Sequence, residues 1–155
     1  PKPLKKDNDL VNIINLNIKL LSKLDKNIDI KFFYKQNKIL FNCDYEQFNR
    51  AIFNILKNSI ESINEKRLKN VDFKGIINID ISKRKDYILL HITDNGLGLT
   101  NINNEDLLKP YFTTKKNGSG LGLSIVNKII IDHNGSFKLM NIENGAKVEI
   151  KFPIK

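Results

Sequence analysis

The chain has 155 residues, of which 41% are hydrophobic and 28% charged, as expected of one soluble globular domain with its own core. It contains no apolar run of the roughly 18–20 residues that cross a membrane, and no secretory signal pattern at its start. The net charge of +9 does not by itself indicate nucleic-acid binding, because the lysines are spread along the chain without interleaved aromatic residues. We therefore expect no nucleic-acid partner and no membrane contact; a basic surface also suits a polyphosphate ligand or an acidic protein.

Cysteine and histidine are too few to indicate a metal centre. Cys43 is the only cysteine, so an internal disulfide and a cysteine-based zinc site are excluded, and we expect a buried or half-buried thiol in a reducing compartment. His91 and His133 lie far apart in the sequence. We interpret His91 as a strand side chain and His133 as a capping residue at the end of a helix.

The first 43 residues predict a linker, a helix and two strands. The chain starts at a proline rather than a methionine, so we expect it to be part of a longer protein, with the polar residues 1–8 as a linker. Helical spacing of apolar residues from Leu10 to Leu24 predicts a helix capped by Asp7 or Asn8. Residues 28–43 predict two short strands around a turn at Gln36–Asn37.

A second helix over 44–66, capped by Asp44, has the clearest pattern. Its apolar face repeats at intervals of three and four residues: Phe48, Ala51, Ile52, Ile55, Leu56, Ser59, Ile60 and Ile63. Residues 75–93 alternate and predict a hairpin that turns at 84–86.

The C-terminal part begins with a long segment, 94–119, that has little periodicity beyond a short helical turn at 103–108. A loop of this length inside a compact domain is usually functional or disordered. A helix over 121–134, a strand over 136–141, an Asn144–Gly145 turn and a last strand follow. This order predicts an α+β fold: a two-layer sandwich with a mixed sheet of about five strands and three main helices on one face.

Glycines occupy every second position from Gly118 to Gly122, directly before the last predicted helix. Glycine costs about 0.5–1 kcal/mol relative to alanine inside a helix or strand, so this run indicates that something approaches the backbone closely. The run does not match the dinucleotide fingerprint, which needs a preceding strand and another spacing, and Gly122 lacks the lysine that follows the last glycine of a Walker A loop. A glycine-rich loop that leads into a helix is nevertheless an anion site.

Two further features suit a nucleotide. The sequence "DNGLG" at Asp94–Gly98 follows a predicted strand, and its carboxylate can accept a hydrogen bond from an exocyclic amino group. Asn54 and Asn58 place amide oxygens on one edge of the second helix, and Mg²⁺ prefers oxygen ligands. Each feature alone has an ordinary structural explanation, since Asn-Gly pairs are common in turns. Together and in this order they indicate a functional site.

With these motifs the chain resembles the catalytic, ATP-binding domain of sensor histidine kinases, in the superfamily that includes gyrase, Hsp90 and MutL. The matching motifs, in chain order, are the asparagine box Asn54–Ser62, the first glycine box Asp94–Gly98, the phenylalanine box of the ATP lid Lys109–Lys116, the second glycine box Gly118–Val126 and the closing strand "NGAKVEIKFP". The chain looks most like the nitrogen-regulation, NtrY/NtrB-like subgroup. The resemblance implies a Bergerat-type ATP-binding fold over 9–155, preceded by a linker from a missing dimerisation domain.

The resemblance also implies a role for each matching position. Asn58 should bind a Mg²⁺ ion that bridges the ATP phosphates, supported by Asn54, while Asp94 should accept a hydrogen bond from adenine. Gly96 and Gly98 should let the base approach. Tyr111 and Phe112 should anchor the lid, and the second glycine box should bind the phosphates through Gly118, Ser119, Gly120, Leu121 and Gly122. From position and charge we expect in addition that Thr114, Lys115 and Lys116 of the lid reach the phosphates and that Lys57 helps to neutralise them.

Some positions depart from the family pattern. Glu61 stands where many histidine kinases have a basic residue, which shifts neutralisation of the phosphates toward Lys57 or the lid lysines. Ala146 and Lys147 stand where some relatives have two threonines, so a hydroxyl contact near adenine is expected to be missing.

The implied chemistry is phosphoryl transfer rather than hydrolysis. The ATPases of the superfamily place a water-activating glutamate at the position of Asn54, and an asparagine cannot act as a base. We therefore expect this domain to transfer the γ-phosphate of Mg-ATP to a histidine on a dimerisation domain of the same parent protein, with a response regulator downstream. We expect the domain to be cytoplasmic, and the sequence leaves open whether the parent protein is anchored in the membrane. The alternatives are an anti-sigma-type serine kinase, which usually keeps the glutamate, and a pseudokinase that binds nucleotide without turnover.

Overall fold

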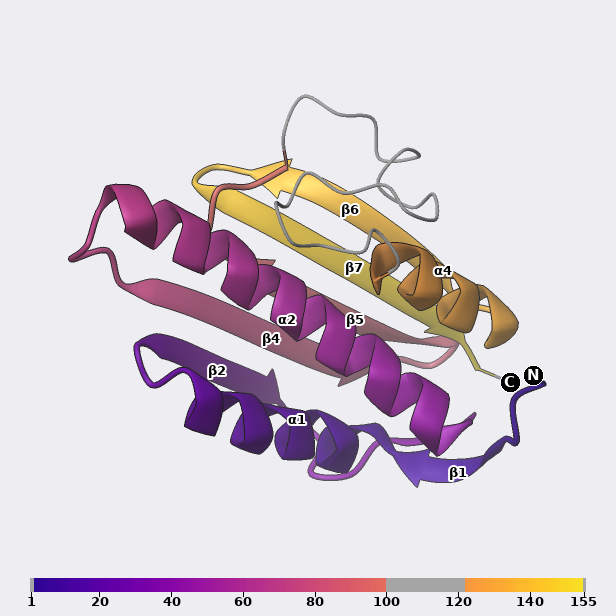
Figure 1. Cartoon of the computed structure of the whole chain (residues 1–155). Helices are drawn as coiled ribbons and strands as arrows, with labels where there is room; N and C mark the ends of the chain where they lie inside the picture. Colours follow the sequence, from indigo (N-terminus) through magenta and orange to yellow (C-terminus); the bar gives the residue numbers. More distant parts are fainter. Residues whose placement is uncertain (1, 100–121, 155) are drawn as a thin grey trace.

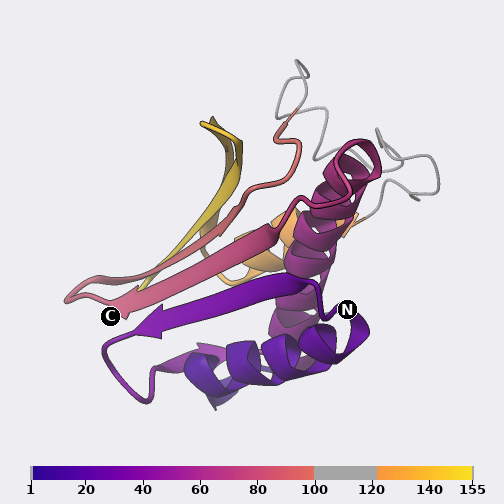
Figure 2. The same cartoon turned by 90° about the vertical axis from the view of Figure 1, so that its left-hand side faces the viewer.

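The computed structural model describes residues 2–99 and 122–154. A five-stranded sheet in the order β2-β4-β5-β7-β6 forms one layer, and α1, α2 and α4 cover one of its faces (Figures 1 and 2). The described elements are β1 Lys6–Asp9, α1 Leu10–Leu24, β2 Ile28–Tyr34, β3 Leu40–Cys43, α2 Tyr45–Lys69, β4 Gly75–Lys83, β5 Tyr87–Asp94, α4 Gly122–Asp132, β6 Ser136–Ile142 and β7 Gly145–Pro153. The predicted α+β sandwich is confirmed. The predicted helical turn at 103–108 lies outside the described residues.

The sheet is mixed because β2 and β4 are joined by a crossover. β2 runs parallel to β4, and α2 lies in the connection between them. The other neighbouring strands are antiparallel, and the predicted hairpins β4–β5 and β6–β7 are both confirmed. The turn between β6 and β7 lies one residue before the predicted Asn144–Gly145 position, because Ile142 pairs with Gly145 and the turn residues are Glu143 and Asn144. Asn144 has a φ of 62°, in the left-handed region that such tight turns use.

The predicted hairpin over residues 28–43 is wrong. β2 pairs with β4, whereas β3 pairs with β1 in a separate two-stranded sheet. Lys6 to Asn8, which we expected in the linker, are therefore part of a strand. Local alternation predicted the two strands of 28–43 but not their partners, because those partners lie far away in the sequence.

The predicted cap of α1 also needs correction. Asp9, not Asp7 or Asn8, is the N-cap: its Oδ1 accepts the backbone N–H of Val11 at 3.1 Å and that of Ile39 at 3.0 Å. The pairing of β1 with β3 brings Asp9 opposite Leu40, next to Ile39. One carboxylate therefore caps the helix and ties it to β3.

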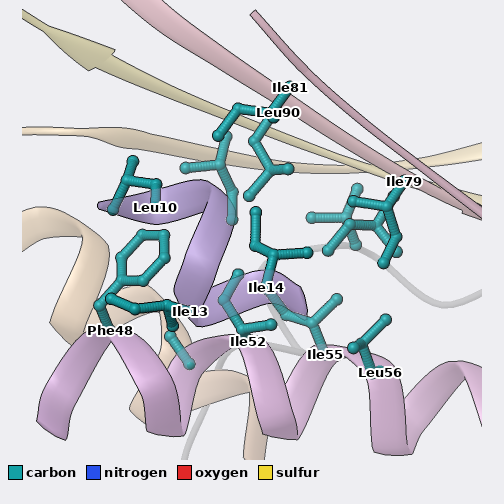
Figure 3. Close-up of a cluster of buried hydrophobic side chains, with 14 of the residues drawn as sticks. Leu10, Ile13, Ile14, Phe48, Ile52, Ile55, Leu56, Ile79, Ile81 and Leu90 are labelled. Carbon is teal, nitrogen blue, oxygen red and sulfur yellow. The ribbon is translucent and has the colours of Figure 1, made fainter. Parts of the chain in front are cut away.

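The core lies between the helices and the sheet. Figure 3 shows side chains of α1 and α2, among them Ile14 and Ile55, that point toward Ile79, Ile81 and Leu90 of the sheet. The predicted apolar face of α2 is buried except for Ile60, which is half-buried, and the Asp44 cap is confirmed by a 3.0 Å bond from the N–H of Gln47. None of the described helices is both long and apolar enough to cross a membrane.

Both histidines make contacts that hold neighbouring elements of the described residues together. His91 on β5 pairs with Glu149 on β7, with 2.9 Å between Nε2 and Oε1. His133 is buried; its Nδ1 lies 2.7 Å from the Ile129 carbonyl oxygen, and its Nε2 accepts the N–H of Asp44 at 3.0 Å. The capping interpretation of His133 is confirmed, and this ring also joins the end of α4 to the start of α2. Cys43 is buried as expected, and burial raises the pKa of its thiol to about 11.

Candidate functional site

Four polar residues form a stripe along one edge of α2. Asn54, Asn58, Ser62 and Lys66 follow at intervals of four residues, so they share one side of the helix. All four are half-buried rather than fully exposed, whereas Lys57 is exposed. Asn58 places this stripe against the N-terminal end of α4, and Ser62 and Lys66 place it against the loop that follows β5.

Asn58 lies beside the first residue of α4. A Cβ atom placed on Gly122 would stand 3.9 Å from Nδ2 of Asn58. The first backbone N–H groups of a helix have no partner within the helix and attract anions. The fold thus places an amide that can bind a cation beside a helix end that can bind an anion. A metal–phosphate ligand needs both.

The loop after β5 begins with a fixed carboxylate. Oδ1 of Asp94 accepts the N–H of Gly96 at 2.9 Å, which sets the direction of the carboxyl group. Asn95 ties the loop to the start of β4: its Oδ1 accepts the N–H of Ile76 at 2.8 Å, and its Nδ2 donates to the carbonyl oxygen of Lys74 at 3.0 Å. The asparagine of this motif is therefore a structural residue.

Gly96 and Gly98 both pack closely against other parts of the protein. A Cβ on Gly96 would stand 2.9 Å from the backbone carbonyl carbon of Ser62. Gly98 has a φ of +79°, and a Cβ there would stand 2.9 Å from the carbonyl oxygen of Gly145. Packing thus explains both glycines without a ligand, and close approach of the base stays a prediction.

The turn between β6 and β7 supports the same loop. A Cβ on Gly145 would overlap the carbonyl oxygen of Asp94, and Oδ1 of Asn141 accepts the N–H of Leu99 at 2.6 Å. Ala146 lies opposite Asp94 in the β5–β7 ladder, so the closing strand does reach the site. Lys147, the next residue, lies opposite Thr93 and points to the other face of the sheet.

The sequence alone did not indicate that Ser62, Lys66, Asn141 and Gly145 support the loop after β5. Ser62 and Lys66 could have been found, because they continue the four-residue spacing of Asn54 and Asn58. Asn141 and Gly145 could not, because their contact with the loop depends on the pairing of β5 with β7. The predicted lid residues Tyr111, Phe112, Thr114, Lys115 and Lys116, and the predicted phosphate-loop residues Gly118, Ser119, Gly120 and Leu121, lie outside the described residues.

The described residues fit a magnesium ion only in part. Within 2–99 and 122–154, no group of at least three His, Cys, Asp or Glu side chains is placed to hold a metal ion. An ion at the Asn58 amide would therefore need phosphate oxygens and water to complete its shell, as Mg²⁺ commonly does.

The described surface also has a hollow of about 680 Å³ lined by residues such as Phe33, Tyr34 and Lys83. It lies at the other end of β4, since Lys83 is six residues, or about 20 Å, beyond Ile77, the partner of Asp94.

Comparisons with known proteins identify the family of this chain. Residues 43–155 match the family described as histidine kinase-, DNA gyrase B-, and HSP90-like ATPase. The chain is 32% identical over 156 residues to an NtrY-like sensor histidine kinase of Rickettsia conorii, covering 100% of this chain and 25% of the relative. It is 34% identical over 116 residues to sporulation kinase B of Bacillus subtilis, covering 74% of this chain and 26% of that kinase.

A solved structure gives the same answer for the fold. The catalytic domain of histidine kinase ThkA superposes with a TM-score of 0.83 at 26% identity, covering 96% of this chain and 95% of that one. The chain spans about a quarter of the length of the curated relatives named above. The resemblance stated from the sequence is confirmed: the chain belongs to the family of histidine kinase-, DNA gyrase B- and HSP90-like ATPases, with the fold of a histidine kinase catalytic domain.

Proposed function

We propose that this chain binds Mg-ATP between α2, the loop after β5 and the N-terminal end of α4, and transfers the γ-phosphate to a histidine elsewhere in its parent protein. The observation that carries the proposal is the position of Asn58 beside Gly122, with the carboxylate of Asp94 held nearby along α2. The names of the relatives, which are sensor histidine kinases, support the same activity.

Each residue in the proposed site has a task that its chemistry allows. The carboxylate of Asp94 accepts a hydrogen bond from the adenine amino group. Asn58 holds Mg²⁺ through its amide oxygen, Asn54 supports it one turn earlier, and the N–H groups at the start of α4 bind phosphate. When bound, Mg²⁺ neutralises phosphate charge and orients the phosphate oxygens. Lys57, Lys115 and Lys116 add positive charge for the transferred group.

The acceptor is proposed to be a histidine rather than water. Asn54 has no ionisable group that could activate water, whereas a neutral imidazole nitrogen needs no base to attack phosphorus. Neither histidine of this chain suits the role, because His91 pairs with Glu149 and His133 bonds two helices. We therefore propose that the acceptor lies on the dimerisation domain of the parent, which passes the phosphoryl group to a response regulator.

The decisive experiment supplies the acceptor. The chain is mixed with the isolated dimerisation domain of an NtrY-like relative, Mg²⁺ and ATP radiolabelled on the γ-phosphate. Acid-labile label on that domain, lost when its histidine is replaced by alanine, is the expected result. Acid-stable label would instead identify a serine kinase. Nucleotide binding without any transfer would identify a pseudokinase.

A further inference from the structure

We infer that Ser62 and Lys66 are positioning residues for the adenine end of the site: they hold the loop of residues 95–97, and through it the carboxylate of Asp94, against the helix that carries Asn58. This inference rests on the proposed function, because it assigns how one end of that nucleotide site is held in place.

Ser62 joins the loop to α2 through a hydrogen bond and direct packing. Its Oγ accepts the N–H of Leu97 at 2.9 Å. A Cβ on Gly96 would stand 2.9 Å from the Cβ of Ser62, so the loop backbone rests on the helix with no room for another side chain. Ser62 thus sets both how closely the loop approaches α2 and where along the helix it sits.

Lys66 holds the same loop one helical turn further on. Its Nζ donates to the carbonyl oxygen of Asn95 at 3.1 Å and lies 3.4 Å from that of Gly96. The ammonium group also lies 4.5 Å from the centre of the Phe73 ring, a cation–π contact that helps to fix its place. The charge of this half-buried lysine is therefore directed at the carbonyl groups of the loop.

The carboxylate of Asp94 depends on these contacts through Gly96. The N–H of Gly96 donates to Oδ1 of Asp94 at 2.9 Å, while the carbonyl oxygen of Gly96 faces Lys66. A shift of the Gly96 backbone would turn the carboxylate, and hydrogen bonds weaken steeply when their angle is lost.

The same helix carries both the proposed metal residue Asn58 and the two residues that hold the loop after β5. Asn58, Ser62 and Lys66 lie one turn apart in sequence, so Asn58 and Lys66 are separated by about 12 Å of rigid helix. A nucleotide that binds at both Asn58 and Asp94 must therefore span a distance that the helix and the loop hold fixed. The stripe on α2 thus combines two tasks: Asn58 is proposed to contact the ligand, whereas Ser62 and Lys66 act on it only through the loop and the carboxylate of Asp94.

The test uses replacements that remove single contacts, each with a matched control. Ser62→Ala removes the acceptor for Leu97, and Lys66→Met removes the ammonium group while keeping an unbranched side chain. Lys66→Arg keeps a charged donor and should restore function. The controls are Ser22→Ala, at a half-buried serine on α1, and Lys69→Met, at an exposed lysine in the last turn of α2.

Calorimetric titration with ADP and Mg²⁺ measures the effect. Ser62→Ala and Lys66→Met should each weaken ADP binding by about three- to tenfold, the loss of roughly one hydrogen bond. Both controls and Lys66→Arg should bind as the unmodified chain does. In a double-mutant cycle with Asp94→Asn, the second replacement should add little, because Ser62 and Lys66 act through the carboxylate that is already gone.

Each outcome decides one question. If Asp94→Asn weakens ADP binding but Ser62→Ala and Lys66→Met do not, the inference is overturned and the proposed function stands. Losses that add fully to that of Asp94→Asn would show that the two residues act on stability or elsewhere, and would also overturn it. If the unmodified chain does not bind ADP, the proposed function fails and the inference fails with it.

Discussion

The replacement Asp94→Asn isolates the proposed contact with adenine. Oδ1 of Asp94 accepts the N–H of Gly96 at 2.9 Å, and the amide oxygen of an asparagine can accept the same bond. The two side chains have nearly the same shape, so the loop and the fold should remain. The replacement removes the negative charge and turns one acceptor oxygen into an NH₂ donor. The adenine amino group would then face a donor.

The size of the effect follows from the loss of a charge-assisted hydrogen bond. Such a bond contributes about 1.5–3 kcal/mol, so the dissociation constant for ADP should rise about 10- to 150-fold. Guanine carries a carbonyl oxygen where adenine has its amino group, so GDP binding should stay the same or improve. Titration calorimetry with both nucleotides in excess Mg²⁺ measures the ratio, with a thermal melt as the control for folding. Equal losses for ADP and GDP in a folded variant would refute the assignment of Asp94.

Three further predictions concern the metal ion, the absence of ATP hydrolysis and the N-cap of α2. Asn58→Ala should remove the gain in ADP affinity that Mg²⁺ gives, without a lower melting temperature, because alanine is the better helix former; calorimetry with and without Mg²⁺ checks this, and an unchanged gain would count against a metal at Asn58. The unmodified chain should bind ATP yet release almost no inorganic phosphate, since Asn54 cannot act as a base, and a colorimetric phosphate assay that shows steady turnover would contradict this. Hydrogen bonds from the N–H groups of Gln47 and Leu4 lower the pKa of the Asp44 carboxyl, so its stabilising contribution is present above its unfolded pKa of about 4 and is lost as pH falls through its folded value. Asp44→Asn keeps the cap but removes this titration, so its melting temperature should fall less than that of the unmodified chain in melts from pH 5 to pH 2, and an identical fall would exclude Asp44 as a contributor.

Local patterns in the sequence predicted most of the elements, because each of those patterns acts within a few residues. The apolar face of α2 and the Asp44 cap are examples, and so is the tight turn between β6 and β7, which lies one residue before the predicted position. The pairing of β1 with β3 and of β2 with β4 could not be predicted in this way. These contacts join residues far apart in the chain, and the polar segment at Lys6–Asp9 shows no alternation that would mark it as a strand.

The motif at Asp94–Gly98 shows why the site was only partly predictable. Its short sequence sufficed to suggest a nucleotide site, but the partners of its backbone lie on separate elements. The N–H of Asn95 donates to the Ile76 carbonyl oxygen at 3.2 Å, that of Leu97 to Ser62 and that of Leu99 to Asn141. These partners belong to β4, α2 and β6, so the loop takes its shape only when the whole sandwich has formed.

Because the loop after β5 is held in place before any ligand binds, binding should need little further ordering of it. A loop that three elements already hold does not lose conformational freedom when a base arrives, so less of the binding free energy is spent on ordering it. The loop loses its conformational entropy when the protein folds, and the burial of α2 against the sheet offsets that loss. The same helix contributes Phe48, Ile52 and Ile55 to the core and Asn58, Ser62 and Lys66 to the proposed site. A core substitution that shifts α2 along its axis would therefore displace Asn58, Ser62 and Lys66 together.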